Sequence, residues 1–157
     1  MKMVYMVVSL MAAGMVAAAT VGHSRILLSS QGAKTLFVRA EAKTFDPAEQ
    51  AASEHARQAT GKAPHAGEVF YKRGVREAAF RHVTTGRIVV RFVPGVDPEA
   101  FAAENGLELR RSFGIGGRSA VFINQSDSDD ITKSNALLQQ QSVESAEPDW
   151  VLPVTVY

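Results

Sequence analysis

Apolar side chains alternate with other positions along residues 87–93, which is the most regular pattern in the chain. A period of two is typical of a strand that buries one of its faces. Pro94 and Gly95 follow directly. Because proline cannot continue a hydrogen-bonded ladder and glycine permits a turn, the strand is predicted to end there. The alternating apolar set is Ile88, Val90 and Phe92.

A short helix and a hairpin are predicted next. Asp97 is a typical N-cap, and Gly106 fits the residue that ends a helix. Residues 107–113 and 118–124 then alternate again on either side of a GIGG turn, which predicts two paired strands. In the first of these strands Arg111 interrupts the apolar set. That set is Leu107, Leu109 and Phe113.

The end of the chain predicts a second helix and a final strand. Residues 129–141 begin with acidic capping residues, and Ile131 and Leu138 lie on one helical face. Residues 142–151 are typical of a strand. Pro148 indicates that this strand lies at an edge of its sheet or ends there, because proline lacks the amide that an inner strand needs.

The predicted order of elements is β-α-β-β-α-β within residues 86–157, the ferredoxin-like arrangement of an α+β domain. Four antiparallel strands form one sheet, two helices cover one face, and the other face stays free for a partner. A core of this size without disulfides or metals is expected to be marginally stable alone and to gain stability from a bound partner.

The amino terminus is predicted to be a membrane-targeting segment, residues 1–22. Residues 3–21 carry no charge, and a helix of that length spans roughly 28 Å, close to the hydrocarbon thickness of a bilayer. One interpretation is a cleaved signal peptide with Ala17 and Ala19 at the cleavage site; the other is a retained single-span transmembrane anchor. We therefore expect a cell-envelope protein, either exported (periplasmic or extracellular) or membrane-anchored.

Residues 23–85 are predicted to be a linker or extension with little regular pattern. Two apolar stretches near its start favour a hairpin, and Asp46 with Glu49 forms a capping-box sequence that predicts a helix over residues 46–60. That helix has no stripe of large apolar residues, which favours a spacer or a helix that folds on a partner. Residues 68–83 fit both a strand and a helix.

The net charge of +1 conceals two parts of opposite sign. Residues 23–85 contain ten basic and six acidic side chains, whereas residues 86–157 contain six basic and ten acidic ones. Opposite signs suggest two segments with different roles. The acidic part is a poor candidate for binding nucleic acid, because phosphate contacts need clustered cations.

The sequence contains no motif that indicates catalysis. It has no cysteine, which excludes disulfides and thiolate metal sites. Its four histidines lack the spacing of metal ligands and are expected to be solvated, so neither a metal nor a cofactor is predicted. No Ser/His/Asp set occurs in the sequence context of a nucleophile, and the protein is not predicted to be an enzyme.

Three segments of residues 86–157 together resemble the propeptide domain of subtilisin-like serine proteases and the related stand-alone inhibitors. The segments are GRIVVRFVPGVDPEAF, the central strand VFI and the closing QSVESAEPDWV. The resemblance implies a sheet that packs on two helices of a protease. It also implies that Glu147 and Asp149 cap those helices, where a carboxylate gains hydrogen bonds and favourable dipole energy.

The resemblance also gives a role to the tail, residues 152–157. By its logic the tail occupies the protease cleft as a product does, with Tyr157 in the primary specificity pocket and Val154 in a second apolar pocket. The partner-binding residues predicted in this way are Glu147, Asp149, Val154, Thr155, Val156 and Tyr157.

The predicted function is that of a protease-binding module, an inhibitor or folding chaperone that acts in trans on a subtilisin-like serine protease. The alternative is a membrane-anchored accessory subunit of a larger assembly, in which the same fold serves only as a docking module. The basic stretch over residues 24–85 favours this alternative, because a simple inhibitor has no need of it. Both hypotheses expect a protein partner.

Overall fold

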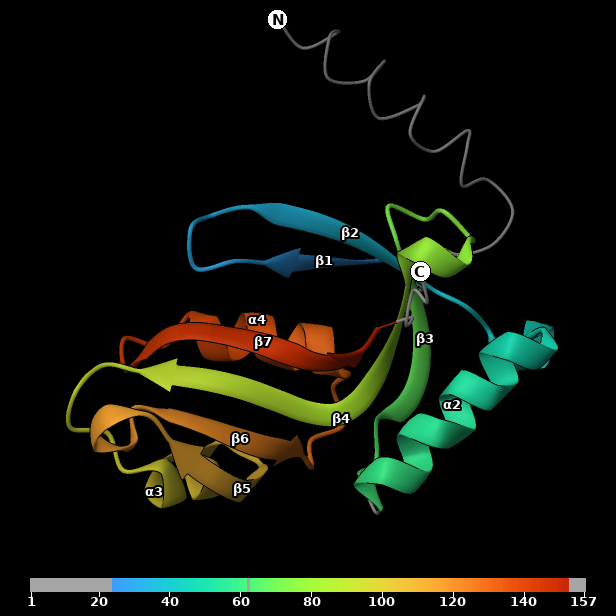
Figure 1. Ribbon diagram of the computed structural model, residues 1–157. Helices are drawn as coiled ribbons and strands as arrows, with labels where there is room; N and C mark the ends of the chain where they lie inside the picture. Colours follow the sequence, from blue (N-terminus) through green and yellow to red (C-terminus); the bar gives the residue numbers. More distant parts are fainter. Residues whose placement is uncertain (1–23, 62, 153–157) are drawn as a thin grey trace, which may run out of the picture.

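The computed structural model describes residues 24–61 and 63–152, which form an α+β protein with one open sheet (Figure 1). Seven strands and three α-helices make up this part of the chain. They are β1 (Ser24–Leu28), β2 (Lys34–Arg39), α2 (Pro47–Thr60), β3 (Ala66–Lys72), β4 (Arg81–Phe92), α3 (Pro98–Asn105), β5 (Leu107–Phe113), β6 (Ser119–Asn124), α4 (Asp130–Leu138) and β7 (Val143–Val151).

The long strand β4 organises the sheet, because three other strands pair with it in antiparallel fashion. β7 accompanies β4 from Val83 to Phe92. β3 pairs with the first half of β4 and β6 with the second half, so these two strands share the edge opposite β7. The sheet extends outward as β3-β2-β1 on one side and as β6-β5 on the other.

Gly86 lies where β4 passes from β3 to β6. Its φ of +74° is a conformation that glycine adopts freely and other residues rarely adopt. A Cβ atom added at Gly86 would lie 2.5 Å from the Cβ of Ala63 and 3.2 Å from the backbone nitrogen of Ala66. The register between β4 and β7 also shifts across this position. Glycine here therefore permits both the bend in β4 and the close approach of the loop before β3.

Helices α3 and α4 cover one face of the second half of the sheet. Even-numbered residues of β4 point toward them and join the largest core cluster, in which Phe92, Phe101 and Phe122 pack edge-on or tilted with ring centroids 4.8–6.1 Å apart. Burying each such side chain contributes roughly 1.5–3 kcal/mol relative to leaving it exposed. The alternation predicted from Ile88, Val90 and Phe92 is confirmed, since all three are buried.

Helix α2 covers the opposite face, over β3 and the first half of β4. The predicted capping box is confirmed: Asp46 accepts from the Glu49 amide at 2.8 Å, and Glu49 accepts from the Asp46 amide at 3.2 Å. The interpretation of this helix as a spacer is wrong, because its stripe of small residues packs on the sheet. At one point the Oγ of Ser53 donates to the Gly67 carbonyl at 2.6 Å. Small side chains allow that approach, as Ala56 also shows by being fully buried in the second core cluster.

The prediction of a simple four-stranded ferredoxin-like sheet is wrong, although the α+β class is correct. Residues 24–72 add three strands to the sheet, and β4 runs continuously across residue 86. The predicted hairpin is β1–β2. Within residues 68–83 the strand alternative is correct, since β3 ends and β4 begins there. Pro148 does lie at an edge, on β7, whose one partner strand among the described residues is β4.

The edge strand β1 is closed by a side chain of α4. The Asn135 amide donates to the Ile26 carbonyl at 2.6 Å and accepts from the Leu28 amide at 2.9 Å, as a neighbouring strand would. Arg25 pairs with Asp129 at 2.8 Å at the start of the same helix. The hairpin is thereby tied to α4, and this edge of the sheet has its backbone groups partly satisfied.

Candidate protein-binding face

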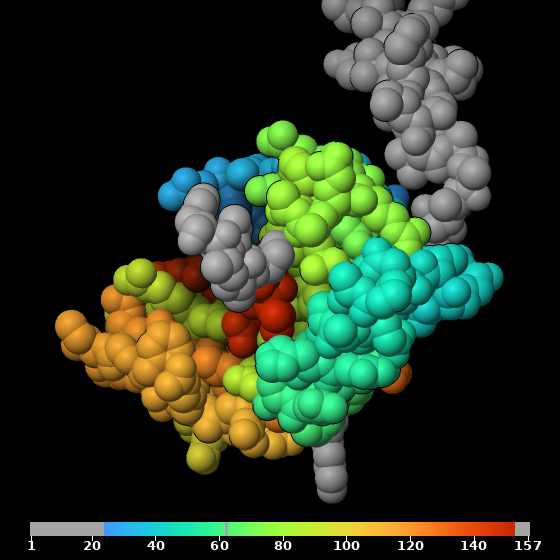
Figure 2. Space-filling view, turned by 45° about the vertical axis from the view of Figure 1, so that its right-hand side comes forward, coloured from blue at the N-terminus to red at the C-terminus, as the bar shows by residue number. Residues whose placement is uncertain are grey.

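Part of the sheet face on the α2 side carries no helix in the described part of the chain. It consists of the second half of β4 with β5, β6 and β7. In Figure 2 the orange surface of β5 and β6 and the cyan surface of α2 stand on either side of a recessed strip formed by β4 and β7. The sequence predicted a free sheet face within residues 86–157; helix α2 packs beside it, on β3 and the first half of β4.

A hollow of about 310 Å³ lies on this face. Val89 and Val121, neighbours across β4 and β6, supply its apolar floor. Its rim comes from β4, β5 and β7, so that three strands position the polar groups around one depression. We call it the arginine hollow; it is lined by Arg87, Val89, Arg110, Arg111, Phe113, Val121 and Asp149.

A β-bulge in β5 places two consecutive arginines in this hollow. Leu109 lies opposite Phe122 and Arg111 lies opposite Val121, so Arg110 is an extra residue with no partner of its own on β6. Bulges re-aim the side chains that follow them. Here the shift turns Phe113, which simple alternation would bury beside Leu109, toward the hollow, where 41% of its surface is exposed.

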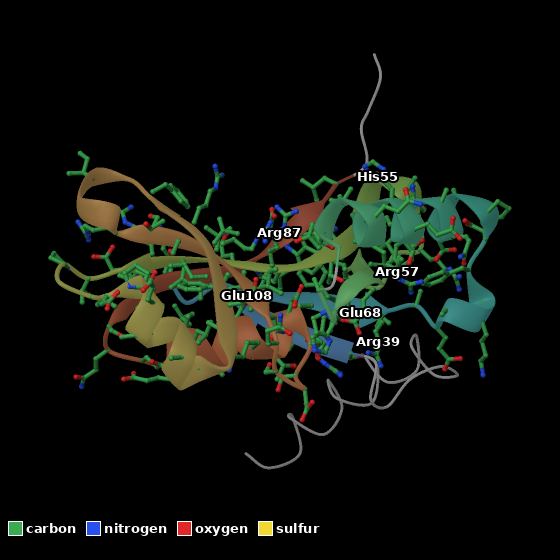
Figure 3. The ribbon with its side chains drawn as sticks, turned by 90° about the horizontal axis from the view of Figure 1, so that it is seen from below. Arg39, His55, Arg57, Glu68, Arg87 and Glu108 are labelled. Carbon is green, nitrogen blue, oxygen red and sulfur yellow. The ribbon has the colours of Figure 1, made fainter. Side chains whose placement is uncertain are left out.

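The arginines of the hollow have no carboxylate partner among the described residues. Arg87 lies between the orange strands and α2 (Figure 3) and donates to the Ala59 carbonyl at 3.3 Å. The guanidinium of Arg111 lies 5.5 Å from the centre of the Phe113 ring, a cation–π arrangement. Among the residues that line the hollow, three guanidinium groups thus stand with one carboxylate, that of Asp149, which is a local excess of positive charge.

Two neighbouring arginines behave differently. Arg91 on β4 pairs with Glu144 at 3.0 Å, and Arg118 pairs with the other oxygen of the same carboxylate. Both guanidinium groups are therefore held by one carboxylate within the molecule. Arg110 and Arg111 differ from these two arginines, because they have no carboxylate partner among the described residues.

The predicted site residues on β7 lie on this same face. Glu147 is exposed opposite Val89, and Asp149 lines the hollow while its carbonyl accepts from the Thr85 hydroxyl at 2.7 Å. The adjacent Trp150 points to the other face and stacks on Phe37, with ring centroids 5.1 Å apart. The remaining predicted residues, Val154, Thr155, Val156 and Tyr157, lie outside the described residues.

Sequence reasoning missed the arginines of this face. The available signal was the interruption of the apolar alternation at Arg110 and Arg111 in LELRRSF. A bulge inserts one extra residue into a strand and so interrupts the alternation of its apolar side chains. Arg87 carried no comparable signal, because an outward arginine on a half-buried strand is ordinary.

A second polar cluster is buried between α4, β6 and β3. Asp130 is fully buried and accepts from the Asn124 amide at 3.0 Å, while its other carboxyl oxygen has no partner among the described residues. Burial, together with the nearby Glu68 carboxylate, raises the pKa of Asp130 to about 7, against the opposing influence of Asn124 and His65. Shifted pKa values are common at catalytic sites, and they are the one property that this cluster shares with such sites.

The other members of this cluster are paired within the fold. Glu68 and Arg39 point toward one another (Figure 3) at 3.1 Å, and the His65 ring meets the Ser126 carbonyl at 2.7 Å. Burial raises the pKa of Glu68, although His65 and Arg39 lower it. No group of three or more side chains suited to a metal ion occurs in residues 24–61 and 63–152.

The expectation of solvated histidines is wrong for two of them. His65 is half-buried in the cluster just described. His82 packs edge-on against Phe37 and Trp150, with ring centroids 5.2 and 5.3 Å away, and burial lowers its pKa. His55 is exposed on α2, and His23 lies outside the described residues.

Fold and site together define an α+β protein with an open antiparallel sheet and a basic, partly apolar hollow on its uncovered face. The family model described as the Open reading frame 2 N-terminal domain matches residues 29–152. The chain therefore belongs to this family. No curated protein and no solved structure matches the chain.

The resemblance to propeptides of subtilisin-like proteases is wrong. The matching family spans residues 29–152 and so includes the strands before residue 86, which the propeptide resemblance left out. The description of the protein as a propeptide-like protease inhibitor was implied by that resemblance and is corrected with it. Within the described residues no helix has the length and apolar character needed to cross a membrane. The apolar run at residues 3–21 lies outside that part of the chain.

Proposed function

We propose that this domain is a protein-docking module whose partner binds at the uncovered sheet face. The observation that carries this proposal is the arginine hollow, in which unpaired guanidinium groups surround an apolar floor beside the exposed Phe113. A few convergent polar groups around an apolar depression are typical of binding sites, and arginine and aromatic residues are enriched in protein interfaces. The proposal retains the second hypothesis of the sequence analysis, a docking module in a larger assembly, in place of the protease-binding one.

The fold suits a docking module. Strands β7, β4, β6 and β5 lie in this order with α3 and α4 on one face, and we regard this part as a ferredoxin-like platform within the larger sheet. The helices and the aromatic core hold the platform rigid, so a partner meets preformed geometry. The side chains that line the hollow include no serine, threonine, cysteine, lysine or histidine, and the proposed role is binding and not catalysis.

The proposed location is the cell envelope, on the basis of the uncharged run at residues 3–21. Whether cleaved or retained, that segment directs the chain to a membrane. A docking module delivered in this way fits an accessory subunit that assembles with another envelope protein.

Site-specific photocrosslinking tests the docking proposal. A photoreactive phenylalanine analogue at position 113 is expected to give a discrete protein adduct in source cells, because that side chain borders the hollow. The same analogue at position 55, exposed on α2, serves as the control. Equal adduct patterns at both positions, or none at position 113, contradict the proposal; mass spectrometry of the adduct identifies the partner.

A further inference from the structure

The strand β5 is an edge of the sheet whose outer side has no partner strand among the described residues. At the far end of the sheet the corresponding edge of β1 is closed by Asn135. β5 instead presents backbone amide and carbonyl groups to whatever lies beside it. An edge of this kind can accept an added strand from another polypeptide.

The side chains around this edge are mostly basic or apolar; the one acidic residue of β5, Glu108, lies near its start and accepts from the Gln125 amide at 3.1 Å. Arg110 and Arg111 stand on β5 itself, and Arg87 lies on β4, on the far side of β6. Phe113 is 41% exposed and Ile115, in the turn that follows, is 95% exposed. Charges on an edge strand by themselves commonly prevent unwanted pairing. Here, however, the bulge gathers two of them over an apolar floor, beside exposed large apolar residues, which is the composition of a binding surface.

From these features, and resting on the docking function proposed above, we infer that β5 binds an extended acidic segment of a partner protein by strand addition. Main-chain hydrogen bonds to β5 supply the affinity. Carboxylates at alternate positions of the added strand lie on the face of Arg110 and Arg111, since opposite charges on neighbouring strands attract. The intervening side chains point to the other face of the sheet, and an apolar side chain at the end meets Phe113 and Ile115.

Single-stranded nucleic acid fits this face less well. The central strands β4 and β6 present Val89 and Val121, whereas sheets that bind single-stranded nucleic acid stack bases on aromatic side chains. The acidic residues Glu147 and Asp149 lie along β7 on the same face. They would repel a phosphate backbone that extends across the sheet, but a strand bound at β5 lies at the opposite edge.

The probe for this inference is a fluorescein-labelled octapeptide of alternating glutamate and valine, with a lysine–valine octapeptide as the charge control. Fluorescence anisotropy with the full chain is expected to show binding of the acidic peptide alone, weakened by salt. Methylation of alternate peptide nitrogens is expected to abolish binding, because it removes donors that a strand needs. Equal binding of both peptides, or undiminished binding of the methylated one, overturns strand addition of an acidic segment.

Protein variants locate the site. Arg110→Glu and Arg111→Glu are each expected to weaken binding about tenfold or more, because they replace attraction by repulsion. Arg91→Glu is the matched control, since that arginine lies on the same sheet but is already paired with Glu144. An equal loss of peptide affinity in all three variants contradicts the inference. It is also contradicted if a single-stranded oligonucleotide binds more tightly than the acidic peptide and its binding depends on Arg111. If the acidic peptide does not bind while the crosslinked adduct at position 113 is still observed, this inference is refuted but the docking function is not.

Discussion

Replacing Asp130 with asparagine is expected to raise the free energy of unfolding at pH 8 by up to about 4 kcal/mol, and to change it little at pH 4. The Asp130 carboxyl has its pKa raised from 3.8 to about 7, chiefly by burial. The folded protein therefore holds a proton that the unfolded chain releases at lower pH. The stability that depends on this proton is present below pH 4, falls as the pH rises toward 7 and is lost above it. Asparagine imitates the protonated carboxyl at every pH.

The adjacent carboxylate provides the matched control for Asp130→Asn. Burial raises the pKa of Asp129, but its bonds to Arg25 and to the amide of Thr132 outweigh burial, and the net shift is downward. Its ionised form thus stabilises the fold above pH 4. Asp129→Asn is expected to lower stability at pH 8, opposite in sign to Asp130→Asn. Urea unfolding at pH 4, 6 and 8 measures both; a loss of stability for Asp130→Asn at pH 8 contradicts the assigned protonation.

Replacing Gly86 with alanine is expected to destabilise the fold by about 3 kcal/mol, from backbone strain of about 1 kcal/mol and overpacking of about 2 kcal/mol. The strain comes from the φ of +74°, and the overpacking from the new methyl group, 2.5 Å from the Cβ of Ala63. The Ala63 backbone also lies within 4 Å, so a small side-chain movement does not relieve the contact. Thermal or urea unfolding of the full chain measures the loss.

Gly116→Ala separates the two causes of that loss. Its φ is +68°, nearly that of Gly86, but no atom lies within 4 Å of an added Cβ. It is expected to lose only the strain energy of about 1 kcal/mol. Ala63→Gly introduced together with Gly86→Ala is expected to restore part of the stability. Equal losses at positions 86 and 116 contradict the proposed close contact.

The helices and strands that were predicted correctly are those with strong local signals. The strand through Ile88 and Phe92 was predicted from its alternation, and α2 was predicted from its capping residues. Both signals arise from neighbouring residues in the chain. The place of α2 in the fold was missed for a physical reason. A helix that approaches a glycine of β3 needs small side chains such as Ser53, and small side chains leave no apolar stripe in the sequence.

The candidate site was predicted only in part for a similar reason. Asp149 was singled out through a resemblance that proved wrong, yet it lines the hollow because the strand predicted for residues 142–151 forms as β7. Arg110 and Arg111 were missed because a bulge depends on the pairing of β5 with β6, and pairing is a long-range property. The unpaired state of their charges is likewise set by the positions of distant carboxylates such as Glu144.

The central place of β4 has a consequence for how the chain folds. The β1–β2 hairpin and the β3–β4 pair each join strands that are near in sequence, and such local contacts form quickly. The β4–β7 ladder, by contrast, joins Val83 to Val151 and requires the closure of a long loop. During synthesis β4 therefore emerges well before the strand that covers its second edge. Until β7 arrives, that edge is open to misassembly, and the rate of this one pairing sets how long the exposure lasts.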